Sequence, residues 1–114
     1  HYGVSAREMI HSGKARAEQT ADILGEALGI RPRATAGLDP LDPVRPIAAE
    51  CNERADDLVI VGHMPFLGRL ATLLLAGRED PPAVAFQRGG MVCLERRGPG
   101  EWILLWTHFP RQPR

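Results

Sequence analysis

The sequence lacks several features that define whole classes of protein. It has no net charge, because 14 basic residues balance 14 acidic ones, so its overall charge attracts neither nucleic acid nor an anionic membrane. No stretch approaches the roughly 18 consecutive apolar residues that a membrane-spanning helix needs. Its two cysteines, Cys51 and Cys93, lie among apolar neighbours. With no secretory leader in the sequence, we expect buried thiols in a reducing cytoplasm rather than a disulfide framework.

The sequence also lacks the residue spacings that mark common cofactor sites. Gly13 and Lys14 suggest a nucleotide-binding loop, but that pattern needs glycine where Glu8 stands and serine or threonine where Ala15 stands. The histidines and cysteines do not have the compact spacing of a zinc site. We therefore expect no metal and no cofactor.

The residues that are present fit one globular domain over residues 1–114. Apolar residues make up 44% of the chain and charged residues 25%, close to ordinary globular usage. Lys14 is the only lysine among the 14 basic residues, and this preference for arginine, together with the many alanines, indicates a GC-rich bacterial gene.

Hydrophobic periodicity and turn residues predict the secondary structure. Between residues 15 and 28, apolar side chains fall on one helical face, with Gly29 as the C-terminal cap and Ser12 as the N-cap. Residues 57–61 form an apolar run without alternation, which indicates a central parallel strand buried on both faces. The other expected elements are strands at 8–11 and 33–36, a loop at 37–43, helices at 46–54 and 66–76, and a hairpin of strands 91–94 and 102–106.

The order of these elements favours an α/β fold with a mostly parallel central sheet and helices on both faces. Such sheets bind ligands at the C-terminal ends of their strands, beside helix N-termini. Two strand-to-helix junctions carry suitable side chains: Ser12, Lys14 and Arg16 at the first, and His63 at the second. Taken alone, Arg16 and His63 are each more often structural residues. Together at one edge, they favour a pocket for a phosphoryl group in which Lys14 and Ser12 bind substrate.

Two segments carry a resemblance to a known family. Residues 11–20, HSGKARAEQT, resemble the second signature of branch one of the histidine phosphatase superfamily, with the greatest likeness to SixA-type phosphohistidine phosphatases. Residues 61–65, VGHMP, are similar to the later signature that contains the family's second catalytic histidine. The resemblance implies a phosphoglycerate mutase-like fold, with Arg16 as the phosphate-binding arginine and His63 as the second catalytic histidine.

One family motif is missing. The family's first strand ends in an Arg-His-Gly tripeptide, whose histidine is the nucleophile, and this sequence contains no such tripeptide. By order along the chain, the missing piece is the first strand and the helix after it, about 30 residues or more. Because that strand is central in the family's sheet, its loss leaves unpaired backbone groups on neighbouring strands. We therefore expect an N-terminally truncated domain whose missing strand comes from a longer polypeptide, a second copy or a partner chain.

For the intact protein, the resemblance implies hydrolysis of phosphohistidine on proteins through a phosphohistidine enzyme intermediate, while these 114 residues alone are expected to be inactive. Two alternatives stay open: an inactive module that binds phosphate or a phosphoprotein, and a monoesterase for small phosphate esters. The implied partner is a phosphorylated protein, such as a histidine-phosphotransfer domain, or a small phosphorylated substrate. We expect a cytoplasmic protein that binds neither nucleic acid nor membrane.

Overall fold

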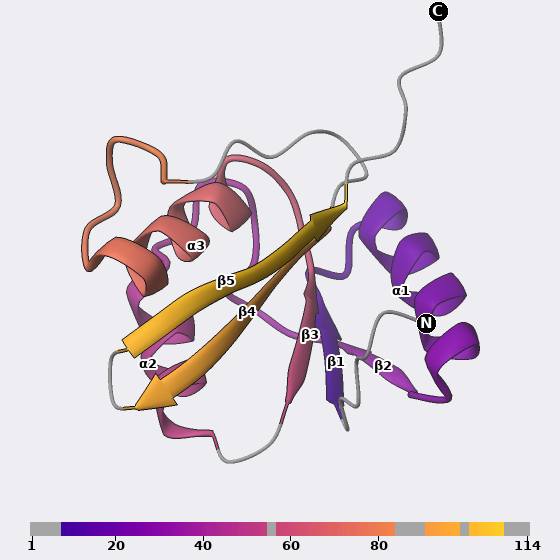
Figure 1. Ribbon diagram of the computed structural model, residues 1–114. Coiled ribbons are helices and arrows are strands. Elements are labelled where there is room, and N and C mark those ends of the chain that lie inside the picture. Colours follow the sequence, from indigo (N-terminus) through magenta and orange to yellow (C-terminus); the bar gives the residue numbers. More distant parts are fainter. Residues whose placement is uncertain (1–7, 55–56, 84–90, 99–100, 109–114) are drawn as a thin grey trace, which may run out of the picture.

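The computed structural model describes residues 8–54, 57–83, 91–98 and 101–108, and its elements follow the predicted order (Figure 1). They are β1 (Glu8–His11), α1 (Ala15–Leu28), β2 (Pro32–Ala34), α2 (Arg45–Glu53), β3 (Leu58–Val61), α3 (Phe66–Ala76), β4 (Met91–Gly98) and β5 (Glu101–His108). No helix in the described ranges has both the length and the apolar composition needed to cross a membrane.

Strands β1, β2 and β3 form a parallel sheet in the order β2-β1-β3. The prediction that residues 57–61 form the central strand is wrong for this sheet, because β1 occupies the centre and β3 pairs, among the described strands, with β1 alone. Three of the four β3 residues are also only half-buried. A strand with helices on both faces is apolar whether or not its second edge is paired, so the apolar run could not distinguish the two positions.

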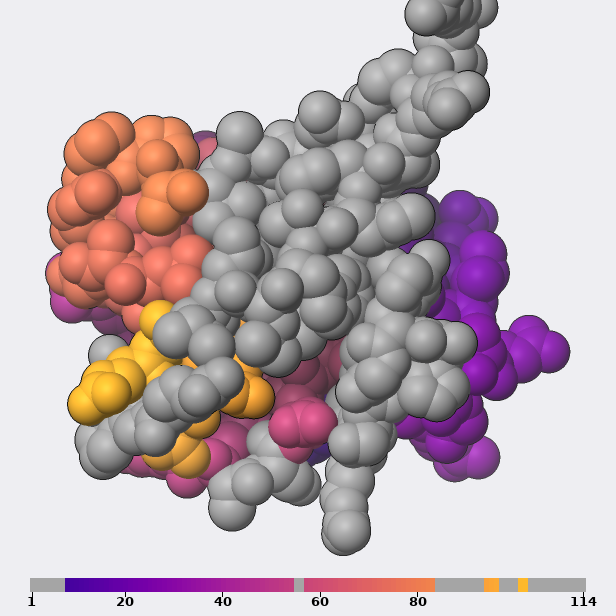
Figure 2. Space-filling model, in the orientation of Figure 1, coloured from indigo at the N-terminus to yellow at the C-terminus, as the bar shows by residue number. Residues whose placement is uncertain are grey.

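Helices cover both faces of this sheet, as the sequence predicts. On one face, Ala17 and Ala21 of α1 are buried together with Met9 and Val61. On the other face, Ile10 joins the buried residues of α2 and α3, because successive strand residues point to opposite sides of a sheet. In Figure 2, α1 in purple and the α3 segment in salmon accordingly lie on opposite sides of the molecule. The α/β class is therefore confirmed.

The predicted hairpin is present as a second, antiparallel sheet formed by β4 and β5. Its strands are longer than predicted, since Arg96 pairs with Trp102 and Gly98 pairs with Glu101 inside the segment expected to be a loop. An antiparallel ladder with one solvated face tolerates such polar residues, so they did not end the strands. Leu94 and Trp102 pack against the core of α2 and α3, which fixes the hairpin on that side of the fold.

Most helix ends agree with the sequence, with one correction at the start of α1. This helix ends at Leu28, and Gly29 follows in the left-handed conformation with φ 71°, as predicted. The N-cap is Lys14 rather than Ser12. Gly13, with φ 85°, turns the chain between Ser12 and the helix, a conformation that glycine adopts without strain. Ser12 consequently lies outside the helix, and its hydroxyl makes a different contact.

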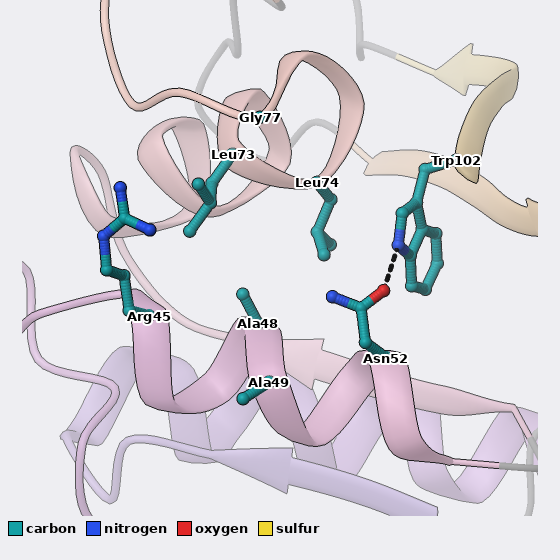
Figure 3. A pocket seen from close by; sticks show the side chains of 8 residues that line it. All are labelled: Arg45, Ala48, Ala49, Asn52, Leu73, Leu74, Gly77 and Trp102. Carbon is teal, nitrogen blue, oxygen red and sulfur yellow. Dashed lines mark hydrogen bonds between the residues drawn. The ribbon is translucent and has the colours of Figure 1, made fainter. Parts of the chain in front are cut away.

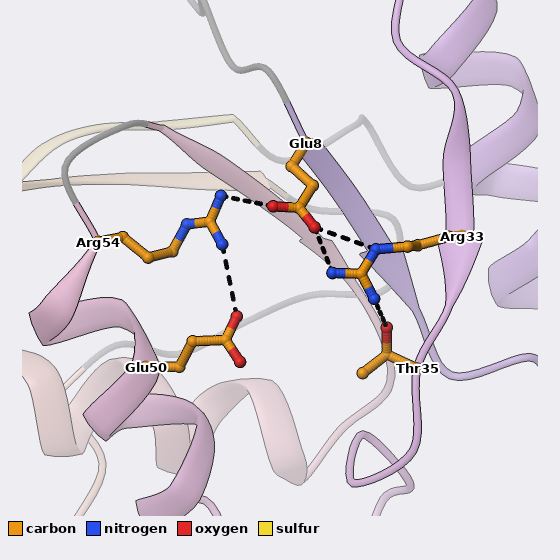
Figure 4. Close-up of polar contacts among 5 residues, drawn as sticks. All are labelled: Glu8, Arg33, Thr35, Glu50 and Arg54. Atoms are coloured by element: carbon orange, nitrogen blue, oxygen red, sulfur yellow. Dashed lines mark hydrogen bonds and ion pairs between the residues drawn. The ribbon is translucent and has the colours of Figure 1, made fainter.

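A charged cluster joins the N-terminal end of the sheet to the end of α2 (Figure 4). Glu8 accepts a hydrogen bond from Arg33 Nε at 3.0 Å, a second from Arg33 Nη2, and one from Arg54 Nη2 at 2.6 Å. Arg33 also donates to Thr35 Oγ1 at 3.0 Å, and Arg54 forms an ion pair with Glu50 at 3.5 Å. The hydrogen bonds from Arg33 and then Arg54 hold the pKa of the Glu8 carboxyl below its usual value.

Replacing Glu8 by glutamine is expected to lower the free energy of unfolding at neutral pH, because a neutral amide accepts weaker hydrogen bonds than a carboxylate. Since folding lowers the pKa of Glu8, its stabilising effect is complete above the carboxyl's usual pKa and disappears as pH falls through the lowered pKa of the folded state. Urea unfolding from about pH 7 to about pH 3 should therefore show the difference between wild type and Glu8→Gln narrowing.

The charge-matched control is Glu53→Gln, which changes an exposed carboxylate on α2 outside this cluster. We expect it to change stability little at any pH in the series. A difference between wild type and Glu8→Gln that stays constant with pH would contradict a stabilising role for the ionised carboxyl.

Candidate functional site

The C-terminal edge of the parallel sheet brings the two predicted junctions together. His11 at the end of β1 lies beside Val61 at the end of β3 in the parallel register. Just beyond them, the Oγ atom of Ser12 lies 2.6 Å from Nε2 of His63, joining residues that are 51 positions apart. Both side chains are half-buried. The side chains at the two junctions are therefore in direct contact.

The first junction uses some of its backbone donors internally. The N–H of Gly13 donates to Nδ1 of His11 at 3.0 Å, and the N–H of Lys14 makes a longer contact, 3.4 Å, with Oγ of Ser12. His11 is only 5% exposed, so its imidazole is enclosed at the end of β1. Because these two amides already have acceptors, an anion at this edge depends on the donors of the next residues along the chain.

Those donors are in the first turn of α1. The first bond of the helical pattern runs from the N–H of Glu18 to the carbonyl of Lys14 at 2.8 Å, so the amides of residues 15–17 have no helical acceptor. Arg16, in the same turn, is exposed and has no hydrogen bond or ion pair within the described part of the chain. The ammonium of Lys14 lies 3.9 Å from Asp39, and both side chains are more than half exposed, so this pair is weak. Both cations can thus turn toward an anion.

The second junction is held by the start of α3. The N–H of Leu67 donates to the carbonyl of His63 at 3.0 Å, and Pro65 is the N-cap after a cis Met64–Pro65 bond. The Met64 side chain packs over Gly68, where an added Cβ would come within 2.8 Å of the Met64 Cε atom. These contacts fix the backbone that carries the imidazole.

The loop at 37–43 is attached to α3 next to this junction. Arg69 donates through Nη2 to the carbonyl oxygens of Pro40 at 3.1 Å and Asp42 at 2.8 Å, and its guanidinium lies 6.0 Å from the centre of the Phe66 ring. The residue between the two carbonyls, Leu41, is 84% exposed. The Leu41 side chain is therefore exposed on a loop whose backbone is hydrogen-bonded to Arg69 on both sides of this residue.

Cys51 does not qualify as a nucleophile. Burial, with a smaller contribution from the charge of Glu50, raises the pKa of its thiol to about 11. At neutral pH the thiol is therefore protonated and unreactive. Cys51 is half-buried on α2 against the core, whereas the sequence predicted a buried thiol. The side chain of Cys93 is outside the described residues.

A hollow of about 450 Å³ lies between α2, α3 and β5, away from the two junctions (Figure 3). Trp102 donates through Nε1 to Oδ1 of Asn52 at 2.8 Å across one end of it, and Arg45 at the other end lies 3.6 Å from Glu79. The rest of the lining comes from Ala48, Ala49, Leu73, Leu74 and Gly77. None of the predicted site residues lines this hollow, and its arginine already has an acidic partner, so we do not place the phosphoryl site there.

Sequence reasoning placed the candidate side chains at one edge of the sheet but missed some of their contacts. It anticipated Ser12, Lys14, Arg16 and His63 at one edge, and the structure places them on the two adjacent junctions. It did not predict the hydrogen bond between Ser12 and His63, nor the attachment of the loop by Arg69. Both depend on how segments distant in the sequence pack, and no local pattern carries that information.

The fold and this edge define the class of protein. The chain has a phosphoglycerate mutase-like α/β fold, with a parallel sheet between helices and the candidate side chains where two strands lead into helices. The solved structure of the protein histidine phosphatase SixA complexed with tungstate has this fold, with a TM-score of 0.78 over 92% of this chain and 69% of that chain. The two sequences are 21% identical, so the likeness is one of fold. No family model and no curated protein matches the sequence.

Proposed function

We propose that this chain is the greater part of a phosphatase that hydrolyses phosphohistidine on proteins. The observation that carries the proposal is the contact between Ser12 and His63, which joins the two family-like segments at the C-terminal edge of a histidine phosphatase fold. Exposed cations and the free amides of α1 lie at the same edge, as a phosphoryl group requires.

The proposed reaction has two steps. A histidine nitrogen on a strand outside this sequence attacks phosphorus, so that a new P–N bond forms as the substrate's P–N bond breaks, and the departing imidazole takes up a proton. Water then attacks the phosphohistidine enzyme, which releases inorganic phosphate and restores the histidine. Arg16, His63 and the amides of residues 15–17 hold the phosphoryl oxygens in both steps, so positioning and electrostatic stabilisation carry most of the catalysis.

The nucleophile strand fits beside β3. Among the described strands, β3 is hydrogen-bonded on one side only, and the β4–β5 hairpin forms a separate sheet. An unpaired strand edge is a template for another strand. We therefore propose that the nucleophile strand pairs with this edge, supplied by a longer polypeptide, a second copy or a partner chain.

Two exposed apolar side chains support a protein rather than a small molecule as the substrate. Leu41 is 84% exposed and Met64 is 47% exposed. The loop that carries Leu41 is hydrogen-bonded to Arg69 of α3, and the Met64 side chain packs over Gly68 of the same helix. Met64 directly follows His63 in the chain. An exposed apolar side chain next to His63, and a second one on the loop bound by Arg69, are suited to the surface of a phosphorylated protein.

Replacing Leu41 or Met64 by serine is expected to lower kcat/KM for a phosphohistidine protein by about fivefold, the usual scale for an interface side chain that contributes to binding. Hydrolysis of p-nitrophenyl phosphate, which reaches only the phosphoryl site, should stay unchanged in Leu41→Ser and should fall by a smaller factor than fivefold in Met64→Ser, because Met64 also packs on Gly68 at the start of α3. Ile23→Ser is the matched control, because Ile23 is 69% exposed on α1 and lies outside both junctions. Equal losses on both substrates would contradict protein contact at these residues.

The proposed function is tested first on the natural gene product that contains this sequence. Its intact mass shows whether a further segment with a nucleophile is present, and its activity is compared on a phosphohistidine protein, p-nitrophenyl phosphate and a sugar phosphate. Preference for the phosphohistidine protein supports the proposal, whereas preference for the sugar phosphate would favour the small-molecule esterase.

A phosphate-binding module without turnover is the second candidate, favoured by the absence of an Arg-His-Gly tripeptide from the sequence. It predicts a gene product of 12.5 kDa that binds tungstate or a phosphohistidine protein saturably, depends on Arg16 for binding, and releases no phosphate. Isothermal titration with tungstate and a phosphate-release assay on the same preparation distinguish the two candidates.

A further inference from the structure

We infer that Ser12 holds His63 in the tautomer that carries its proton on Nδ1, so that the neutral imidazole presents a hydrogen-bond donor to the phosphoryl site. In this role Ser12 is a positioning residue that acts through His63. The inference rests on the site assignment proposed above, and it adds which ring nitrogen carries the proton and what keeps it there.

The length of the contact indicates which atom donates. Ser12 Oγ and His63 Nε2 are 2.6 Å apart. Hydrogen bonds donated by N–H groups to oxygen are usually about 2.7–3.2 Å long, so this separation is short for donation by the imidazole. The separation therefore favours the hydroxyl as donor and Nε2 as acceptor, which leaves the proton of a neutral ring on Nδ1.

The other contacts of the hydroxyl agree with this direction. Ser12 Oγ already faces a backbone donor, the N–H of Lys14 at 3.4 Å, so one of its lone pairs is directed there. Within the described part of the chain, Nε2 of His63 is the one remaining partner of that hydroxyl, and Ser12 is the one side-chain partner of the imidazole. Donation from Ser12 to His63 uses the hydroxyl proton and leaves Nδ1–H with no acceptor among the described residues.

The neighbouring histidine is held in the opposite tautomer. Nδ1 of His11 accepts the N–H of Gly13 at 3.0 Å, so a neutral His11 must carry its proton on Nε2. Two histidines at the same edge of the sheet are thus expected to have opposite tautomers, each fixed by a hydrogen bond from the turn that follows β1. His11 provides an internal reference for any measurement on His63.

This tautomer would let the neutral His63 imidazole donate a hydrogen bond to an anion. With Nε2 occupied by Ser12, the ring nitrogen left for a phosphoryl oxygen is a donor without prior protonation. Without the hydroxyl, the proton can move to Nε2, and Nδ1 then offers a lone pair that repels an anion. Ser12 should therefore raise anion affinity under conditions in which the imidazole is uncharged.

The test is nitrogen-15 NMR of the uniformly labelled protein, recorded over a pH series and analysed at about pH 8 once the spectra show that both imidazoles are neutral there. Long-range proton–nitrogen correlations distinguish protonated from unprotonated ring nitrogens. The signals are assigned by their loss in His11→Gln and His63→Gln. We expect His63 as the Nδ1–H tautomer and His11 as the Nε2–H tautomer, with Ser12→Ala shifting His63 toward Nε2–H, Ser12→Thr preserving the wild-type pattern, and His11 unchanged in both variants.

Tungstate titration at the same pH supplies the functional readout. Ser12→Ala should weaken binding about tenfold, on the scale of one hydrogen bond to a charged group, and Ser12→Thr should restore most of the affinity. A wild-type His63 in the Nε2–H tautomer, or an Nδ1–H tautomer that persists in Ser12→Ala, would overturn the inference. Failure of wild type to bind tungstate while the tautomers are as expected would count against the proposed function and leave the role of Ser12 in fixing the tautomer intact.

Discussion

Arg16→Ala and His63→Ala are each expected to lower the phosphatase rate of the natural gene product at least about a hundredfold, the scale of removing one donor to the transition state. Arg16 lies in the first turn of α1 and has no partner among the described residues, so its guanidinium is available to two phosphoryl oxygens at once. His63 lies at the neighbouring junction, where its ring contacts Ser12 and its carbonyl accepts a hydrogen bond from the start of α3. Single-turnover assays with a phosphohistidine protein measure the loss directly.

Two controls separate catalysis from folding in this experiment. Arg31→Ala removes an exposed guanidinium beyond the C-terminal end of α1, at the opposite end of the helix from Arg16, and should leave the rate within about twofold of wild type. Arg16→Lys keeps the charge but loses the planar pair of donors, so it should recover only part of the activity. Turnover near the wild-type rate in both alanine variants would contradict the assignment of Arg16 and His63 to the site.

Local sequence patterns predicted the fold well because each element depends mainly on its own residues. The helical face of α1 ends at Leu28 with a left-handed Gly29, and the apolar residues of that face pack on the sheet as their spacing requires. The two junctions could also be placed at one edge, since parallel strands end on the same side. The sequence patterns did not predict which side chains contact one another across that edge.

Those contacts depend on geometry that one-dimensional patterns do not contain. Ser12 occupies a position that resembles an N-cap in sequence, yet Gly13 inserts a left-handed turn and the hydroxyl reaches His63 instead. Likewise, the apolar run of β3 was compatible with a central strand and with its position at the edge of the described strands, because helices cover its faces in both cases. Arg69 binds the carbonyls on either side of the exposed Leu41, a long-range contact that the loop's own sequence does not encode.

The edge of β3 should show the second large effect, in backbone amide exchange. In a parallel sheet, alternate residues of a strand direct their backbone groups to opposite neighbours, so part of β3 faces away from β1. Where a strand pairs with that side, those amides can exchange only when the sheet opens. If the gene product contains the strand, we expect these amides to exchange at least about a hundredfold more slowly in it than in the 114-residue chain alone.

Amides of β1 provide the internal control, because β1 is paired on both sides within this chain and should be protected equally in the two samples. If the gene product has no further segment and a second copy supplies the strand, protection of β3 should instead rise with protein concentration, together with a dimer in solution scattering. A folded monomer of the 114 residues with fully protected β3 amides would contradict the proposal. In that case the edge would be satisfied within the chain itself, and the nucleophile would have no place in this sheet beside His63.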